Sequence, residues 1–225
     1  MNEEESGRIR QVFVARDGRR PRAWMTRGYA ALTDERRALT AGILGREFAK
    51  LEHPTILDVG CGGGLDLEWW RQHGWQASRL AGIDLVDERV AAAQVRNPGV
   101  DVRRGEGGTL PFADAAFDVA TASTVFSSIS NASSRRSLFT EISRVVRPGG
   151  VIIVYDFVIR NPRNAHVVAM TERRLADLAS RLADEAWSVS PLIYAVGPAA
   201  LLHPKLGHLV GRMMPRTHRL SLWRV

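Results

Sequence analysis

The sequence predicts an α/β fold in which a doubly wound, mostly parallel sheet is covered by helices on both faces. Short apolar runs typical of strands alternate four or more times with stretches of helical periodicity. The runs are almost continuously apolar, as in strands that are buried on both faces. A glycine-rich loop at residues 60–64 follows the first run and opens a helix. Together these patterns favour a parallel sheet with a ligand-binding turn after its first strand.

The first fifty residues predict helices that precede the sheet. Residues 1–20 are polar and weakly periodic, which indicates a loose acidic tip followed by a short helical or extended arm. From residue 23 to residue 51 apolar side chains recur at helical spacing, and Thr33 or Asp34 is placed to cap a second helix. We therefore expect a helical N-terminal arm over residues 1–52.

The remaining elements follow from changes of period along the chain. We expect strands at residues 55–59, 80–85, 100–104, 117–123 and 151–157, with helices at 65–73, 86–96 and 133–146. In the tail we expect a helix at 171–182 and strands at 187–196 and 219–225, on either side of a segment rich in proline and glycine.

Composition excludes several classes of protein. The chain of 225 residues is 45% hydrophobic and 24% charged, which is ordinary globular usage. Cys61 is the only cysteine, so an intramolecular disulfide, a thiolate zinc site and a Cys-x-x-Cys redox pair are excluded. No apolar stretch reaches the length of a signal peptide core or of a membrane span. We expect a cytoplasmic protein without a membrane span.

Positive charge is concentrated at both ends of the chain. The net charge is +7, and residues 186–225 hold five Lys or Arg side chains and no acidic one. Such a balance favours an anionic partner, nucleic acid included. A solvated arginine-rich surface explains it equally well.

The glycine loop has the chemistry of a nucleoside site. Glycines let the backbone approach a ligand, and the following helix N-terminus offers free N–H groups. Counted from Gly60, the third glycine of a dinucleotide motif falls on Leu65, which disfavours NAD or FAD. No lysine lies near the loop, which disfavours an ATP-binding phosphate loop.

The motif Asp58-x-Gly60-x-Gly62-x-Gly64 resembles the first motif of class I S-adenosylmethionine-dependent methyltransferases. Its companions follow in order: Asp84 at the end of the second strand, then Gly-Glu-Gly at 105–107, Leu-Pro-Phe at 110–112, Phe-Asp-Val at 117–119 and Arg-Pro-Gly-Gly at 147–150. The whole set of motifs in this order is more specific than any one of them. Glu106 stands where aspartate is commoner in the family. Residues 107 and 108 are both glycine, so no side chain follows it beside the adenine.

This resemblance implies a Rossmann-like, mostly parallel seven-stranded sheet with an antiparallel last strand. It implies one methyltransferase domain over residues 1–225, with an arm or lid at 1–52, the cofactor-binding core at 53–160 and acceptor-side and C-terminal strands at 161–225. It also implies S-adenosyl-L-methionine as the cofactor and S-adenosyl-L-homocysteine as the product. Asp84 would accept from the ribose hydroxyls and Glu106 from the adenine amino group. The full set of implied cofactor residues is Asp58, Gly60, Cys61, Gly62, Gly64, Asp84, Leu85, Glu106, Gly107 and Ser123.

A narrower resemblance concerns the acceptor. Residues 124–129, 154–157, 161–164 and the final Thr217-His218 are similar to a bacterial group associated with glycan or natural-product biosynthesis. It implies O-methylation of a hydroxyl on a sugar, glycoside or natural-product small molecule. A hydroxyl is a poor nucleophile, so a base helps, and Asp156 and His166 are the candidates. Asp156 can equally cap a helix or pair with Arg160 or Arg163.

Other functions stay open at this stage. The basic ends leave room for an RNA or protein methyltransferase, but residues 123–126 lack the motif of adenine-N6 enzymes and one cysteine cannot supply a cytosine-C5 cysteine pair, so nucleic acid is disfavoured as a partner. A non-catalytic module that binds the cofactor is the third reading. We expect a monomer or homodimer and no metal site.

Overall fold

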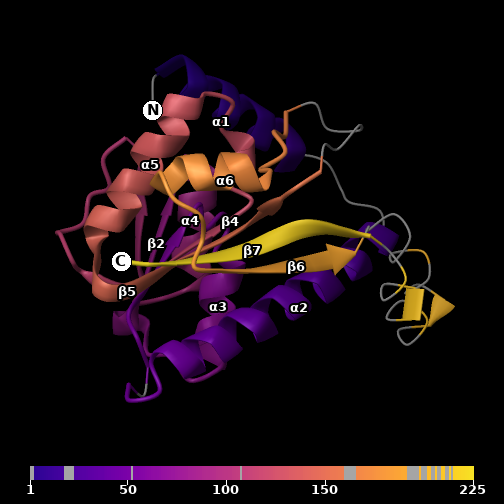
Figure 1. The fold of residues 1–225 in the computed structure, drawn as a ribbon, viewed down its shortest axis with the longest axis horizontal. Helices are drawn as coiled ribbons and strands as arrows, with labels where there is room; N and C mark the ends of the chain where they lie inside the picture. Colours follow the sequence, from indigo (N-terminus) through magenta and orange to yellow (C-terminus); the bar gives the residue numbers. More distant parts are fainter. Residues whose placement is uncertain are drawn as a thin grey trace.

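The computed structural model describes residues 3–17, 23–51, 53–106, 108–159, 166–191 and 215–225, together with residues 198, 202, 203, 206, 209, 210 and 213. Within these ranges the chain forms one seven-stranded sheet between two layers of helices (Figure 1). No helix among the described residues is long and apolar enough to cross a membrane.

The sheet has the strand order β3-β2-β1-β4-β5-β7-β6. Strands β1 to β5 pair in parallel, whereas β7 pairs antiparallel with both β5 and β6. This confirms the predicted doubly wound sheet with an antiparallel last strand. The strands are β1 Ile56–Val59, β2 Leu80–Asp84, β3 Asp101–Arg104, β4 Phe117–Ser123, β5 Val146–Phe157, β6 Glu185–Pro191 and β7 Arg216–Arg224.

Two hydrophobic clusters assign the helices to opposite faces of the sheet. One cluster joins the sheet to α2 Ala23–Glu47, α3 Leu65–Gln72 and α4 Asp87–Arg96. The other joins it to α1 Glu3–Asp17, α5 Ala132–Val145 and α6 Glu172–Ala179 (Figure 1). Successive residues of β5 alternate between the clusters, with Ile152 and Val154 in one and Ile153 in the other, as a pleated strand requires. Both faces are therefore covered, which explains the almost continuously apolar strands.

The arm differs from the prediction in two respects. The expected break at Thr33 or Asp34 is absent, because α2 runs unbroken from Ala23 to Glu47. Leu32 is buried before that point and Ile43 after it, so one apolar stripe continues through it. The expected acidic tip and arm form the single helix α1, and its Glu5 is buried.

In the tail, α6 is shorter than predicted and begins and ends at identifiable caps. The Thr171 side chain accepts a hydrogen bond from the backbone N–H of Arg174, and Ser180 ends the helix in a left-handed conformation at φ 55°. The strand expected at 187–196 is present as β6, and its last five predicted residues lie outside the described part of the chain.

Candidate functional site

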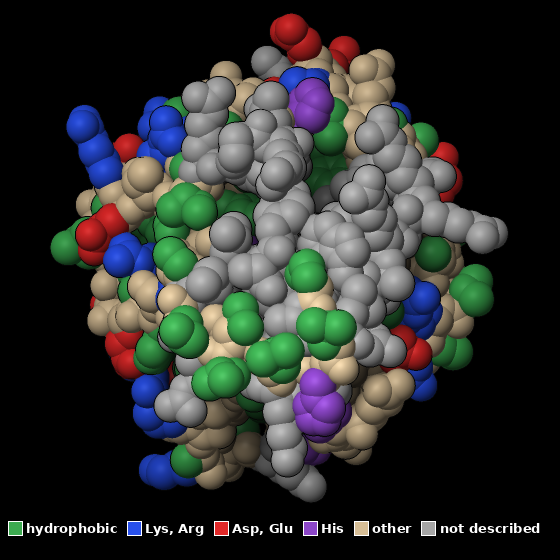
Figure 2. Space-filling model, turned by 90° about the vertical axis from the view of Figure 1, so that its right-hand side faces the viewer, with side chains coloured by type: hydrophobic (Ala, Val, Ile, Leu, Met, Phe, Trp, Pro, Cys, Tyr) green, Lys and Arg blue, Asp and Glu red, His purple; other side chains and the backbone are tan. Residues whose placement is uncertain are grey.

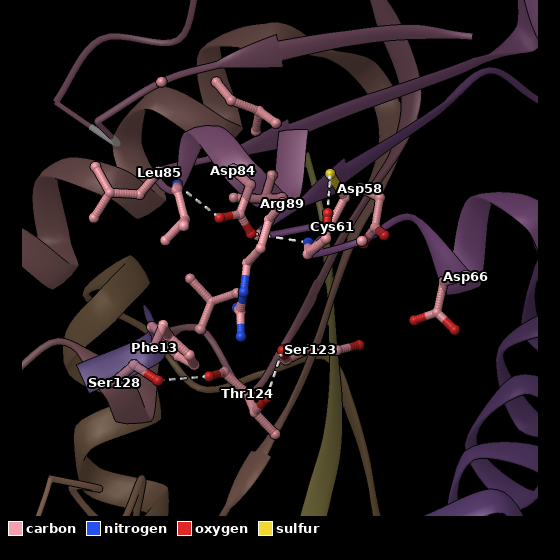
Figure 3. A pocket seen from close by; sticks show the side chains of 18 of the residues that line it. Phe13, Asp58, Cys61, Asp66, Asp84, Leu85, Arg89, Ser123, Thr124 and Ser128 are labelled. Atoms are coloured by element: carbon pink, nitrogen blue, oxygen red, sulfur yellow. Dashed lines mark hydrogen bonds between the residues drawn. The ribbon is translucent and has the colours of Figure 1, made fainter. Parts of the chain in front are cut away.

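A pocket of about 650 Å³ lies at the carboxyl edge of the sheet, which is the edge where the parallel strands end. Its floor comes from the ends of β1, β2 and β4 and from the turns that follow them, in the crevice where such sheets bind ligands. Helices α1 and α2 line it through Ile9, Phe13, Arg36 and Arg37, and residues of α4 and α5 complete the wall. Figure 3 shows the pocket from close by, with Asp58, Asp84 and Thr124 among the labelled residues.

The glycine loop is built from backbone hydrogen bonds to the neighbouring strand. The N–H groups of Gly60 and Cys61 donate to the carbonyl of Ile83 at 2.7 and 3.0 Å. Gly60 has φ 69°, and a Cβ there would lie 2.5 Å from Cγ2 of Val125. The loop therefore needs glycine at this position both for its backbone angle and for the close approach of the next wall.

Asp84 ties the glycine loop to the end of β2. Its Oδ2 accepts from the N–H of Gly62 at 2.8 Å, and its Oδ1 accepts from the N–H of Val86 at 3.0 Å (Figure 3). Each carboxylate oxygen has a second lone pair, so the side chain can still accept from a ligand in the pocket that it lines. This geometry suits a diol, because two donors can be bound by one fixed carboxylate.

The buried Asp58 and the half-buried Asp66 lie near each other and near two arginines. Asp58 is 3% exposed and accepts from Oγ1 of Thr121 at 3.0 Å. Burial and the neighbouring Asp66 raise the pKa of Asp58 to about 7, against the opposing charge of Arg36. Asp66 itself is held by Arg36 at 2.7 Å and Arg37 at 2.8 Å. Although burial opposes it, the pKa of Asp66 is lowered by these two cations.

Helix α1 docks on the loop after β4 through Glu5. The Glu5 carboxylate accepts from the backbone N–H of Ser130 and from its hydroxyl, the latter at 2.8 and 2.9 Å. Arg8 pairs with Glu5 at 2.9 Å and donates to the carbonyl of Ser128 at 2.7 Å. These donors lower the pKa of Glu5 to about 2, so the contact is ionic at neutral pH. The docking holds Ile9 and Phe13 against the pocket.

Arg89 reaches from α4 across the pocket toward Phe13 (Figure 3). Its guanidinium carbon lies 4.3 Å from the centroid of the Phe13 ring, which is cation–π distance. Arg10 of α1 also lies 3.9 Å from Glu106, at the end of β3. The wall made by α1 is therefore attached to three separate parts of the sheet edge.

Thr124 holds strained backbone at the end of β4. Its φ is 56°, an outlier for a β-branched residue. Its N–H donates to the carbonyl of Tyr155 at 2.7 Å, and its own carbonyl accepts from Oγ of Ser128 at 2.9 Å. Strain of this kind persists where the surroundings overdetermine it, which occurs most often at functional sites. Here it turns Val125 toward the glycine loop.

The predicted cofactor residues mostly converge on the pocket. Gly64 does not line it; this residue is the N-cap of α3, with φ 77°. Gly107 lies outside the described residues. Glu106 lines the pocket and pairs with Arg104 at 2.7 Å. The structure brings together eight of the predicted set: Asp58, Gly60, Cys61, Gly62, Asp84, Leu85, Glu106 and Ser123.

The two candidate bases do not line this pocket. Asp156 is 1% exposed, and its carboxylate accepts from the backbone N–H groups of Ser127 at 2.9 Å and Phe157 at 3.0 Å. Burial raises its pKa to about 6, against those hydrogen bonds. It holds the short helix η2 Phe126–Ser128, which follows the strained Thr124. His166 is exposed, beyond the end of β5.

Sequence reasoning missed the side chains that close the pocket. Phe13, Arg36, Arg37 and Arg89 lie on helices and belong to none of the quoted motifs. No signal in the sequence marks α1 as part of the pocket wall. The burial of Glu5, which anchors this helix, becomes visible only in three dimensions. Among the described residues, no group of three or more His, Cys, Asp and Glu side chains is arranged to hold a metal ion.

Comparisons with known proteins agree with this geometry. Residues 57–154 match a family model described as a methyltransferase domain. A probable S-adenosylmethionine-dependent methyltransferase of Mycolicibacterium smegmatis is 34% identical over 99 residues, which are 44% of this chain and 36% of that protein. The chain therefore spans well under half the length of that relative.

Two solved structures share the fold. An S-adenosylmethionine-dependent methyltransferase from Mesorhizobium loti aligns with a TM-score of 0.58 at 19% identity, over 82% of this chain and 96% of the other. Geranyl diphosphate C-methyltransferase from Streptomyces coelicolor, solved with Mg²⁺, geranyl diphosphate and S-adenosyl-L-homocysteine, aligns with a TM-score of 0.58 at 18% identity, over 77% of this chain and 71% of the other.

Proposed function

We propose that the chain is a class I S-adenosylmethionine-dependent methyltransferase, as the match of residues 57–154 to a methyltransferase domain supports, and that it methylates a hydroxyl group on a sugar, a glycoside or a natural-product small molecule. The observation that carries the proposal is the joint placement of the glycine loop and Asp84 at the carboxyl edge of the sheet. The hydroxyl acceptor rests on the resemblance of the segments that follow β4 and β5.

The residues of the pocket fit S-adenosylmethionine. The space that a Cβ would fill at Gly60 is taken by Val125. The glycine loop and the turn after β4 therefore approach each other as closely as their atoms allow. We assign the ribose hydroxyls to Asp84 and the adenosine end to Leu85 and Glu106, all of which line the pocket. The bound S-adenosyl-L-homocysteine of the geranyl diphosphate enzyme supports the same cofactor here.

When bound, the cofactor supplies a methyl group on a sulfonium, which transfers to a nucleophile placed in line with the carbon–sulfur bond. The turn from Ser123 to Val125 lies at the end of β4, between the glycine loop and the segments after β5. We assign this turn to the boundary between cofactor and acceptor. Positioning alone contributes up to about 7 to 11 kcal/mol to such reactions.

We expect rate to depend more on this positioning than on a base inside the pocket. Asp156 is buried, and its carboxylate accepts a hydrogen bond from the backbone N–H of Ser127. A direct proton transfer to it would therefore need the η2 turn to open. Asp156 and His166 remain candidate bases only if the acceptor extends beyond the pocket, toward the end of β5. A pH profile of the rate measured on Asp156→Asn and His166→Ala tests both candidates.

The proposal is tested by isothermal titration of the protein with S-adenosylmethionine and S-adenosyl-L-homocysteine, repeated on Asp84→Ala. We expect micromolar binding that weakens about 100-fold, because two charge-assisted hydrogen bonds are lost. Glu88→Ala is the matched control, as an acidic residue that also lines the pocket. Transfer of a labelled methyl group to simple glycosides then tests the acceptor class. An intact protein that binds neither compound refutes the proposal.

A further inference from the structure

Asp58 is a buried carboxylate in the pocket wall, and no cation among the described residues forms an ion pair with it. It lies on β1, just before the glycine loop, and is 3% exposed. Its carboxylate accepts a side-chain hydrogen bond from Oγ1 of Thr121 at 3.0 Å. On the face at the carboxyl edge, the acidic side chains drawn in Figure 2 lie around the rim, whereas Asp58 is buried. A carboxylate in such a place is costly in its charged form until a cation or further donors reach it.

Two arginines of α2 lie close by, but both pair with a different acid. Arg36 lies 2.7 Å and Arg37 2.8 Å from the carboxylate of Asp66, in the first turn of α3. Their charges therefore serve Asp66 first, and Asp58 faces an acid as well as a cation. Burial and the charge of Asp66 raise the pKa of Asp58 to about 7, against the charge of Arg36.

The other titratable or charged groups around Asp58 come from three further elements. Asp84, at the end of β2, is another acid in the pocket wall and adds to the negative charge. Cys61 of the glycine loop lies beside Asp58 (Figure 3), and burial raises the pKa of its thiol, so it stays neutral. Arg89 of α4 lines the same pocket, with its guanidinium against the ring of Phe13. The described side chains therefore leave Asp58 short of one positive charge.

We propose that Asp58 is a cation subsite of this pocket, which holds a proton in slightly acidic solution while the pocket is empty and releases it to solvent when a positively charged group of the ligand binds beside it. The exchange breaks only the O–H bond of the carboxyl group. The ligand is S-adenosylmethionine, whose ammonium and sulfonium groups both carry the missing charge, so this inference rests on the proposed function. Because the cation replaces a proton, binding strengthens as pH rises through the range in which Asp58 ionises.

Isothermal titration counts the exchanged protons. The full chain is titrated with S-adenosylmethionine at pH 6 and at pH 7, each in two buffers of different ionisation enthalpy. Both pH values lie below the usual pKa of an α-amino group, so the ligand keeps most of its ammonium charge. We expect release of about 0.9 proton per bound ligand at pH 6 and about 0.5 at pH 7, and an affinity that rises about fivefold between them. Binding without proton release overturns the proposal and leaves the cofactor assignment intact.

Three variants trace the protons to this carboxyl group. Asp58→Asn has nearly the same size but cannot ionise, so it should release none of these protons and lose the fivefold rise. Asp66→Asn should also lower the proton count at pH 6, because Arg36 is then free to pair with Asp58. Glu88→Gln is the matched control, since this exposed acid also lines the pocket, and it should release as many protons as the wild type. Equal counts for the wild type and Asp58→Asn overturn the assignment.

Two further ligands distinguish the two sources of positive charge. S-adenosyl-L-homocysteine has the ammonium group without the sulfonium, and 5′-methylthioadenosine has neither. Proton release with both S-adenosyl compounds supports the proposal with the ammonium as the cation. Release with S-adenosylmethionine alone supports it with the sulfonium as the cation. Release on binding of 5′-methylthioadenosine overturns it, because that ligand carries no cation.

The stored proton can also be detected without any ligand. The infrared difference spectrum between the wild type and Asp58→Asn should show the carbonyl band of a protonated carboxyl group at pH 6, and this band should fade by pH 8. Its absence at pH 6 overturns the proposal. A protein that binds neither S-adenosyl compound refutes the proposed function and the exchange with it, whereas binding without proton release refutes the exchange alone.

Discussion

The glycine-loop wall of the pocket is held by backbone atoms, whereas the wall made by α1 is held by side chains from distant parts of the sequence. On the first wall, backbone N–H groups meet the carbonyl of Ile83 and the carboxylate of Asp84 within one βαβ unit. On the second, Glu5 reaches Ser130 across 125 positions of the chain. The glycine-loop wall is therefore part of the folded core, whereas the α1 wall is bound to that core by side-chain contacts.

This difference predicts that the two walls fail in different ways. Damage to the backbone wall should lower the free energy of unfolding of the whole domain, because Gly64 of the loop also packs against Ala93 of α4 and Asn97. Damage to the side-chain wall should lower cofactor affinity while global stability stays close to that of the wild type. The following substitutions separate the two outcomes.

The largest effect is expected for Gly64→Ala. Gly64 has φ 77°, and a Cβ there would meet the side chain of Asn97 and the Cα of Ala93, the latter at 3.1 Å. Left-handed strain and overpacking together should cost about 2 to 5 kcal/mol in the free energy of unfolding, measured by denaturant titration. Gly62→Ala is the control, since Gly62 has φ 54° but nothing within 4 Å of the added Cβ. Equal losses would show that packing between α3 and α4 is irrelevant.

A smaller effect, on affinity alone, is expected for Glu5→Ala. Loss of the carboxylate removes the docking of α1 on Ser130 and frees Ile9 and Phe13 from the pocket. We expect about tenfold weaker binding of S-adenosyl-L-homocysteine by titration and faster release in stopped flow, since one charged contact is lost. The exposed Glu4 of the same helix turn supplies the control Glu4→Ala. A large drop in the free energy of unfolding would contradict this prediction, because it would show that the two walls unfold as one unit.

The smallest effect concerns Asp58, which lies at the end of β1 near Arg36 of α2. Its folded pKa of about 7 exceeds the usual value for aspartate, so the folded protein holds a proton that the unfolded chain has released. Stability therefore falls as pH rises through this range, by about 1 kcal/mol between pH 6 and pH 8. Asp58→Asn should remove this part of the slope. Parallel stability curves for the two proteins would contradict the assignment.

The sequence predicted the backbone wall and missed the side-chain wall for one physical reason. Glycines with positive φ, and the acid at the end of β2, are required at fixed spacing by a local turn, so they leave a motif. Phe13 and Arg89 meet only after α1 and α4 have packed on the same sheet edge. No spacing along the chain records such a contact.

The same reasoning explains the errors in the elements. The helix break expected at Thr33 or Asp34 follows a local capping preference, which is weaker than the burial of a continuous stripe from Leu32 to Ile43. Asp156 was proposed as a candidate base from its place near the carboxyl end of β5. Its burial, and the N–H of Ser127 that it accepts from, depend on how the turn after β4 folds back.

The position of β7 also has a consequence for the order of assembly. This strand follows β6 in the sequence but lies between β5 and β6 in the sheet, pairing Val151 with Arg224. During synthesis β6 emerges from the ribosome before the strand that it must pair with, and β5 keeps an open edge until then. The connection between β6 and β7 is thus made before β6 can join the sheet. We expect the insertion of β7 to be the late, slow event that commits the domain to its native form.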